Sequence, residues 1–180
     1  MKKKVTILLL FLLLFTTPLF AKKYSFTAIP FSNQVILYES YEPGIRYSDC
    51  GFGLKASSFA DESSDTTFGV EASIESFKYE DFHDYYDFKL SGNYRIKYPH
   101  KNEDKYEVCL IFGLGSDFVL RDDEEAGLYF LINTGLEAKY RVNEKFDAIV
   151  GLNGALTFQE GSCVFHVNNY IGASCPVRGK

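Results

Sequence analysis

Charged side chains recur at every second position over long stretches of this chain, with apolar residues between them. Asp87, Lys89, Arg95 and Lys97 show the pattern, because Phe, Leu, Tyr and Ile residues take the alternate positions. Residues that alternate in this way share one face of a β-strand. On one enclosed face, acidic and basic groups can neutralise each other, and they can also act as acids, bases or cation ligands. We expect one network of charges inside a narrow barrel, built from Glu71, Glu75, Asp87, Lys89, Arg95, Lys97, Glu107, Asp117, Glu137, Lys139, Arg141 and Asp147.

The three histidines do not form a catalytic pattern. Hydrolysis by a Ser/His pair requires an acid that orients the histidine, and none is evident near His166 and Ser162. His100 falls in a turn, and His83 lies in the acidic segment 80–84. A loop cation site is one interpretation of that segment, but a solvated acidic loop is the simpler one, as it is for 122–125. We therefore expect no enzymatic activity, no cofactor and no metal.

The charged positions belong to segments whose alternation predicts strands. The clearest is 126–142, where Leu128, Phe130 and Ile132 share one face and Asn133 and Glu137 the other. We expect Pro30 to interrupt part of the first strand and a bulge to shift the register near Phe77. The predicted strands are 24–38, 45–58, 66–79, 84–98, 105–120, 126–142, 145–159 and 162–175. Eight is the even number that a closed up-and-down barrel requires.

Pairs of aromatic residues lie twelve positions apart on the apolar faces of these strands. Such a pair spans about 40 Å of extended chain, which a tilt of about 45° reduces to roughly the 30 Å hydrocarbon thickness of a bilayer. Aromatic girdles at the two interfaces of a transmembrane barrel have this spacing. The pairs are Tyr86 with Tyr98, Tyr106 with Phe118, and Phe146 with Phe158.

The first 21 residues have the pattern of a secretory signal peptide, with Lys2, Lys3 and Lys4 before an apolar run and Ala21 as the cleavage position. Residues 22–180 then form a single domain. Without those three lysines, 16 basic residues remain against 24 acidic ones, a formal net charge of −8. Such a charge disfavours nucleic acid as a partner.

The four cysteines, Cys50, Cys109, Cys163 and Cys175, raise the question of disulfide bonds in an exported chain. A disulfide requires Cα atoms within roughly 7 Å, and the predicted strands keep these residues apart. We expect free or partly buried thiols, and no pair has the spacing of metal ligands.

In its eight alternating strands and its aromatic pairs, the chain resembles the small eight-stranded outer-membrane barrels of Gram-negative-type bacteria, the OmpA, OmpX and OmpW kind, and spirochaete outer-membrane proteins. The resemblance covers about residues 24–177. It implies an all-β, antiparallel transmembrane barrel in contact with outer-membrane lipid, with both chain ends in the periplasm. The chain departs from the family at its end, because the last strand lacks the usual terminal aromatic residue. The implied periplasmic turns are 61–65, 99–104 and 142–144, and the implied outer loops are 39–44, 79–85, 121–126 and 159–162.

We expect a non-enzymatic outer-membrane protein with a structural or surface role, or one that allows limited passage of small molecules. Alternation alone does not decide which face of the sheet is outside. A soluble exported barrel of the lipocalin kind, carrying a small apolar ligand, has the same period with its apolar face inside. That carrier is the alternative.

Overall fold

The computed structural model describes residues 23–40, 44–60, 65–79, 85–99, 105–121, 126–159 and 162–178. The expected signal peptide, the acidic segments 80–84 and 122–125, and the residues His83 and His100 lie outside this part of the chain. No helix in the described ranges has the length and hydropathy needed to cross a membrane.

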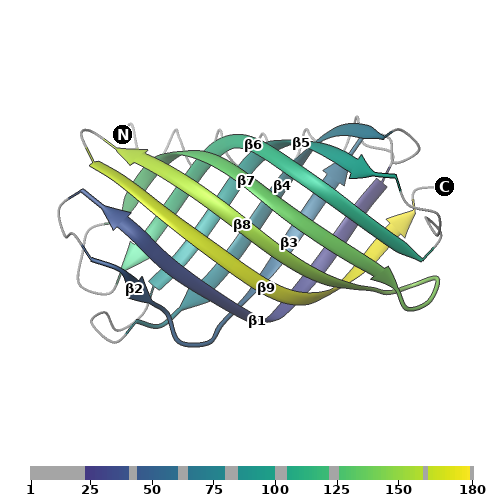
Figure 1. The fold of residues 1–180 in the computed structure, drawn as a ribbon, viewed down its shortest axis with the longest axis horizontal. Coiled ribbons are helices and arrows are strands. Elements are labelled where there is room, and N and C mark those ends of the chain that lie inside the picture. The colour runs from purple at the N-terminus through teal and green to yellow at the C-terminus, as the bar shows by residue number, and fades with distance from the viewer. Residues whose placement is uncertain are drawn as a thin grey trace.

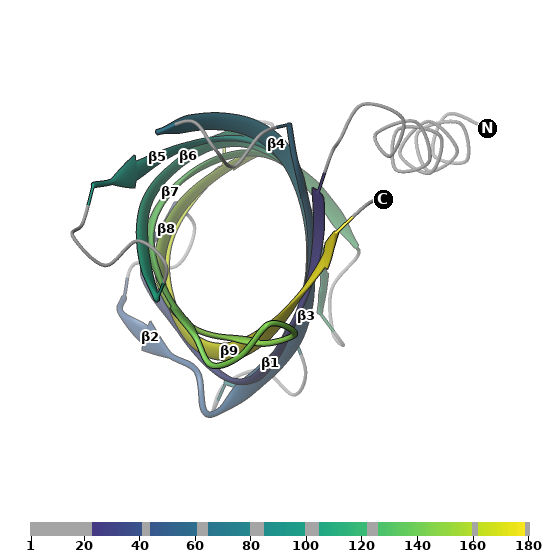
Figure 2. The same ribbon diagram turned by 90° about the vertical axis from the view of Figure 1, so that its right-hand side faces the viewer.

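The described chain forms one antiparallel sheet of eight long strands and one short strand (Figure 1). The strands run diagonally around a common axis, and the sheet closes on itself when viewed along that axis (Figure 2). The strands are β1 (Lys23–Glu39), β2 (Arg46–Tyr47), β3 (Gly51–Phe59), β4 (Thr66–Phe77), β5 (Tyr85–Tyr98), β6 (Tyr106–Arg121), β7 (Gly127–Arg141), β8 (Asp147–Gln159) and β9 (Ser162–Arg178). The expectation of an eight-stranded up-and-down barrel is confirmed.

The first and last strands close the barrel. β1 pairs with β9 in antiparallel register from Lys23 opposite Arg178 to Glu39 opposite Val164. We call the end of the barrel where β9 finishes the turn end, and the opposite end the loop end. At the turn end, β7 and β8 are joined by a tight hairpin, in which the Asn143 side-chain oxygen accepts bonds from the N–H groups of Lys145 and Phe146.

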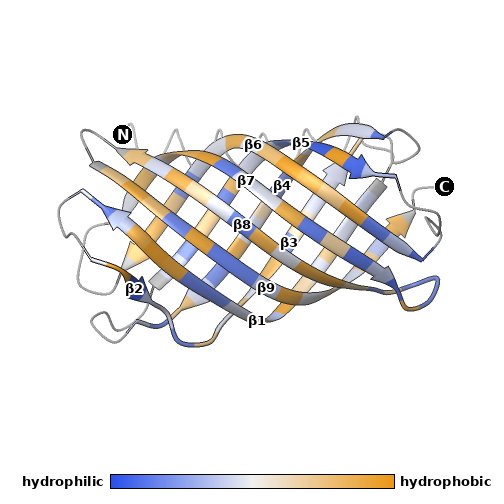
Figure 3. Ribbon diagram, in the orientation of Figure 1, coloured by the Kyte–Doolittle hydropathy of each residue, from blue (hydrophilic) through white to orange (hydrophobic). Residues whose placement is uncertain are grey.

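Most large apolar side chains of the strands point outward, and most polar side chains point inward. Leu114 and Leu152 are 59% and 53% exposed, whereas Asn93 and Asp117 are fully buried. The alternation appears along the strands in Figure 3, where hydrophobic and hydrophilic positions succeed one another. A soluble carrier has the reverse arrangement, so the lipocalin-like alternative does not describe this chain.

The aromatic residues of the expected girdles lie on the outer face, one member of each pair toward each end. Toward the turn end, the rings of Tyr106 and Tyr140 lie 5.1 Å apart, centre to centre. Toward the loop end, Phe118 pairs with Leu128 and Phe158 with Phe130. The outward-facing aromatic residues of the expected set are Tyr86, Tyr98, Tyr106, Phe118, Phe146 and Phe158.

The register of β1 shifts twice against β9, whereas the expected bulge near Phe77 is wrong. β4 pairs with β5 in unbroken register from Thr66 to Phe77. The side chain of Phe77 points into the lumen like the alternate residues before it, and there it contacts other apolar residues. The register of β1 instead shifts around Pro30 against both neighbours. Proline has no N–H group to donate to the ladder, and a bulge removes the need for one.

The second predicted strand, 45–58, is interrupted. Residues 48–50 separate β2 from β3, and both of these strands pair with β1. Ser48 holds the break in place, because its N–H donates to the Gln34 carbonyl and its hydroxyl accepts from the Gln34 N–H. Asp49 donates its N–H to the Lys78 carbonyl and so links the segment to the chain beyond β4.

The outward face can be tested with Leu152, which lies near the middle of β8. Leu152→Arg places a charge in the apolar belt, the band of exposed apolar side chains around the outer face. We therefore expect the free energy of unfolding in lipid vesicles to fall by about 2–4 kcal/mol. Val142 is equally exposed but lies in the hairpin at the turn end. Val142→Arg is therefore the matched control, with an expected loss of about 0–1 kcal/mol. Equal losses in a urea titration of the two variants would contradict a lipid-facing belt.

Candidate functional site

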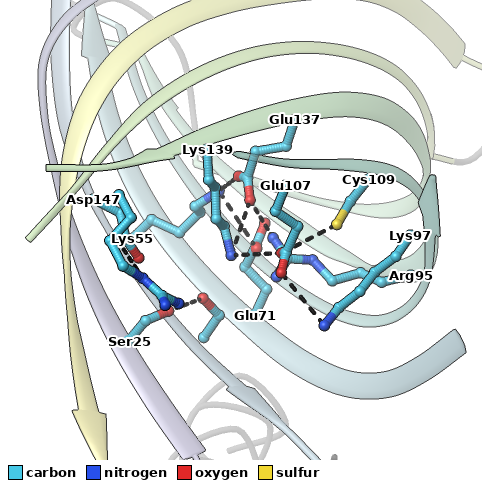
Figure 4. A network of polar contacts seen from close by, with 12 residues as sticks. Ser25, Lys55, Glu71, Arg95, Lys97, Glu107, Cys109, Glu137, Lys139 and Asp147 are labelled. Carbon is cyan, nitrogen blue, oxygen red and sulfur yellow. Dashed lines mark hydrogen bonds and ion pairs between the residues drawn. The ribbon is translucent and has the colours of Figure 1, made fainter. Parts of the chain in front are cut away.

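The interior of the barrel is built around the carboxylate of Glu137 on β7. Lys55 on β3 donates to one of its oxygens at 2.5 Å, and Arg95 on β5 forms an ion pair with the other. The hydroxyl of Tyr170 on β9 donates to the same oxygen as Lys55 at 2.6 Å. We call Lys55, Arg95, Glu137 and Tyr170 the central network (Figure 4, where all but Tyr170 are labelled). It connects four strands that are not neighbours in the sheet.

A glycine makes room for one arm of this network. Gly151 on β8 lies opposite Tyr170 in the register of β8 and β9. A Cβ atom on Gly151 would overlap the Tyr170 ring. Because the ring lies flat against the bare backbone, its hydroxyl reaches both Glu137 and Lys55, the latter at 2.9 Å.

A looser set of ion pairs continues toward the turn end. Glu107 lies 3.4 Å from Lys97 and 3.5 Å from Lys139, so one carboxylate links β5, β6 and β7 (Figure 4). Arg141 and Asp147 are 3.9 Å apart at the hairpin between β7 and β8. These groups are partly exposed, and pairs of this kind contribute little to stability.

The charges in the loop half of the lumen are mostly acidic. Lys89 donates to Asp87 at 2.5 Å, and Asn168 donates to Glu75 at 2.6 Å. Asp117 on β6 is fully buried beside them. The elements that place these groups are β4, β5, β6 and β9, each with its polar face inward.

Side chains fill the space between the two halves. A cavity of about 30 Å³ remains at mid-height, lined among others by Lys55, Glu71, Glu75, Lys89 and Tyr170. A cavity needs roughly 10–15 Å³ of such space to hold a water molecule, so this one has room for ordered water. Asn93 and Asn133 lean over Gly113, where a Cβ atom would meet both amide oxygens.

All twelve charged residues selected from the sequence lie on the inward face. The structure brings Arg95 and Glu137 into the central network, with Glu71 at 3.6 Å from Lys55 and Lys139 at 3.7 Å from Glu137. It groups Lys97 with Glu107 and Arg141 with Asp147 near the turn end. The remaining residues, Glu75, Asp87, Lys89 and Asp117, lie in the loop half.

Two central residues were not selected from the sequence. Lys55 lies on a strand whose alternation is weak because small residues occupy both faces. Tyr170 was missed because aromatic residues were expected to face outward, whereas its side chain points into the lumen. The apolar cluster of Ile36, Phe77, Tyr79, Val119 and Val164 inside the loop end was also not expected. The pairing of Gln159 with Ser162 sets the register of β9, and the even-numbered residues of β9, Tyr170 among them, then face inward.

All four cysteines are free thiols, as the sequence predicts. Cys109 is buried in the lumen, where its thiol donates to Glu107 at 3.3 Å. Cys50 is exposed in the break between β2 and β3.

No protein-family model matches the chain, and no curated protein is similar to it in sequence. The barrel is similar to the crystal structure of Neisserial surface protein A, with a TM-score of 0.62 and 11% identity over 88% of this chain and 98% of that one. The chain has the fold of the small outer-membrane β-barrels.

Two further solved structures are similar to this barrel. The outer membrane enzyme PagL gives a TM-score of 0.50 and 12% identity over 82% of this chain and 99% of that one. The N-terminal barrel domain of Pseudomonas aeruginosa OprF gives a TM-score of 0.49 and 16% identity over 87% of this chain and 98% of that one. At these identities the likeness concerns the fold, and the function has to be argued from the lumen itself.

The central network can be tested by removing its shared carboxylate charge. Glu137→Gln leaves Lys55 and Arg95 buried without their main counter-charge, so we expect the free energy of unfolding to fall by about 3–5 kcal/mol. Glu107→Gln removes the same charge from a partly exposed pair and is the matched control, with a loss below about 1 kcal/mol. Urea unfolding of both variants in lipid vesicles measures the difference. A loss for Glu137→Gln no larger than that of the control would show that the central network does not hold the lumen together.

Proposed function

We propose that this protein is an integral outer-membrane barrel with a closed lumen and a structural or surface role, and that it is neither an enzyme nor an open pore. The apolar outer face lies in outer-membrane lipid, with both chain ends in the periplasm and the loop end toward the exterior. In this arrangement the barrel is a rigid membrane anchor for the segments that connect its strands at the loop end.

The outer face supports lipid as the main partner. Leu, Ile, Val, Phe and Tyr side chains cover it on every long strand, and many are more than 40% exposed. A contiguous apolar surface around a whole molecule is not tolerated by a soluble monomer. A bilayer removes that surface from water, while the closed sheet pairs the backbone groups that lipid cannot satisfy.

The central network is the observation that carries the closed-lumen proposal. Lys55, Arg95, Glu137 and Tyr170 meet at the axis from four strands, and Lys55, Arg95 and Glu137 are at most 5% exposed. Arg95 also lies over the Phe59 ring at 4.3 Å. An eight-stranded barrel has an interior just wide enough for side chains to fill. A solute larger than water has no path past these groups.

The one histidine that the structure describes supports the non-enzymatic proposal. His166 lies inside the lumen at 2% exposure, and its Nε2 atom has no hydrogen-bond partner among the described residues. A general base has to reach both a nucleophile and a substrate. At 2% exposure, the imidazole of His166 does not face solvent, from which a substrate would approach. The fold alone does not decide the matter, since PagL is itself an enzyme.

Planar-bilayer recordings test the closed lumen. We expect the wild-type protein to show no steady conductance. Arg95→Ala removes one side chain of the central network while Glu137 keeps Lys55 as its partner, so we expect brief, small openings in this variant. Arg141→Ala removes the same charge at the half-exposed turn end and should behave like the wild type.

A stable, large open channel in the wild-type recordings would contradict the closed lumen and favour the passage of small molecules. If the wild-type protein and Arg95→Ala both stay closed, the closed lumen is supported, but Arg95 is not one of the side chains that close it. Hydrolysis of outer-membrane lipid or peptide by the purified barrel, lost in His166→Gln, would contradict the non-enzymatic part of the proposal.

A further inference from the structure

Three buried side chains converge in the loop half of the lumen from strands that are not all neighbours. Asp87 on β5, Asp117 on β6 and His166 on β9 offer ligand atoms that all lie within 4.8 Å of one another. None of the three is more than 2% exposed. β5 and β6 are adjacent, but β9 approaches them across the barrel, so the sheet's closure creates the group.

Most of the atoms that point into this group have no partner. His166 Nε2, both carboxylate oxygens of Asp117 and Oδ1 of Asp87 form no hydrogen bond with the described chain. The second oxygen of Asp87 is occupied, because Lys89 donates to it at 2.5 Å and Gln34 at 3.5 Å. A buried polar atom without a partner costs about 1–3 kcal/mol, and a charged one costs more. A bound cation would satisfy all four of these atoms at once.

The local charge is also unbalanced. The carboxylates of Glu75, Asp87 and Asp117 face the single ammonium group of Lys89 in this half of the described lumen. With every carboxylate ionised and the imidazole neutral, two negative charges are left over. Uncompensated charge in a buried site is strongly destabilising. A doubly charged cation would neutralise the group.

We propose that Asp87, Asp117 and His166 form a structural site for a divalent first-row transition-metal ion, of which zinc fits best. Two carboxylates and one imidazole nitrogen suit zinc and its neighbours, whereas magnesium and calcium take oxygen ligands. Lys89 and Gln34 hold Asp87 by one oxygen and leave the other toward the ion, which is the usual role of groups behind a metal ligand. The sequence predicts no metal, because the three residues are separated along the chain.

The site is shielded at the loop end by the apolar cluster of Ile36, Phe77, Tyr79, Val119 and Val164. Ile36 lies opposite His166 in the pairing of β1 with β9, and Val119 lies opposite Asp87 in that of β5 with β6. These neighbours keep water away from the ligands. The bound ion would therefore exchange slowly and would stabilise the folded barrel rather than activate a water molecule.

Cobalt(II) is the probe for this site, because its visible absorption reports coordination by nitrogen and oxygen. The barrel is folded in detergent with cobalt present, passed through a desalting column, and measured for bound metal and for its spectrum. We expect about one ion per wild-type chain, displaced by zinc, without the thiolate absorption that the free cysteines would give. Asp117→Asn and His166→Gln should each weaken binding by more than about 100-fold.

Glu107→Gln is the matched control, because it removes one lumen carboxylate outside the site and should bind cobalt as the wild type does. Circular dichroism and the gel mobility of the folded form show that each variant is folded. Zinc should raise the urea midpoint of the wild type and of Glu107→Gln, but not that of Asp117→Asn.

A folded wild-type barrel that retains no cobalt would overturn the proposal and leave a proton shared between Asp87 and Asp117 as the means of neutralising the group. Equal binding by the wild type, Asp117→Asn and His166→Gln would also overturn it. Neither result would affect the closed lumen, which depends on the central network and is tested by conductance.

Discussion

A β-sheet that faces lipid has to pair all of its backbone N–H and C=O groups within the sheet, since the hydrocarbon region contains no water to bond them. In this chain the pairing of β1 with β9 meets that requirement, because it turns an open sheet into a ring without edges. The closure sets the direction of every strand's two faces, and so it decides which residues meet lipid and which meet each other. The register shift at Pro30 serves the same requirement. It lets β1 stay paired with both neighbours although proline has no N–H group to donate.

Closure also confines many charged side chains to a narrow space. The chain responds differently in the two halves of the lumen. Toward the turn end, Lys55, Arg95, Lys97 and Lys139 surround Glu137 and Glu107, so that each carboxylate has more than one cation in reach. Toward the loop end, the carboxylates outnumber the cations, and the unpartnered oxygens of Asp117 mark the deficit. The first half neutralises its charges with its own residues, and the proposed metal ion would neutralise those of the second half.

The alternation of residues was enough to predict the eight strands, their outward apolar faces and the inward direction of the charged positions. It was not enough where the alternation itself is broken. Small residues on both faces of β3 hid Lys55, and the apolar side chain of Phe77 suggested a bulge where the strand only fills the loop end of the lumen. The grouping of Asp87 and Asp117 with His166 depends on how strongly the sheet curves, because β9 meets β5 and β6 only across the barrel. Periodicity within one strand contains no information about that approach.

The position of Glu137 has a consequence for how the barrel assembles. Its partners Lys55, Arg95 and Tyr170 are separated from it by 82, 42 and 33 residues along the chain. The complete network forms only when the strands from β3 to β9 have come together, so some of these groups stay hydrated until then. Contacts between such distant parts of a chain slow folding, because much entropy is lost before any of them forms. We therefore expect the loss of hydration and the gain of the ion pairs to fall in the same late step, which would disfavour partly closed barrels.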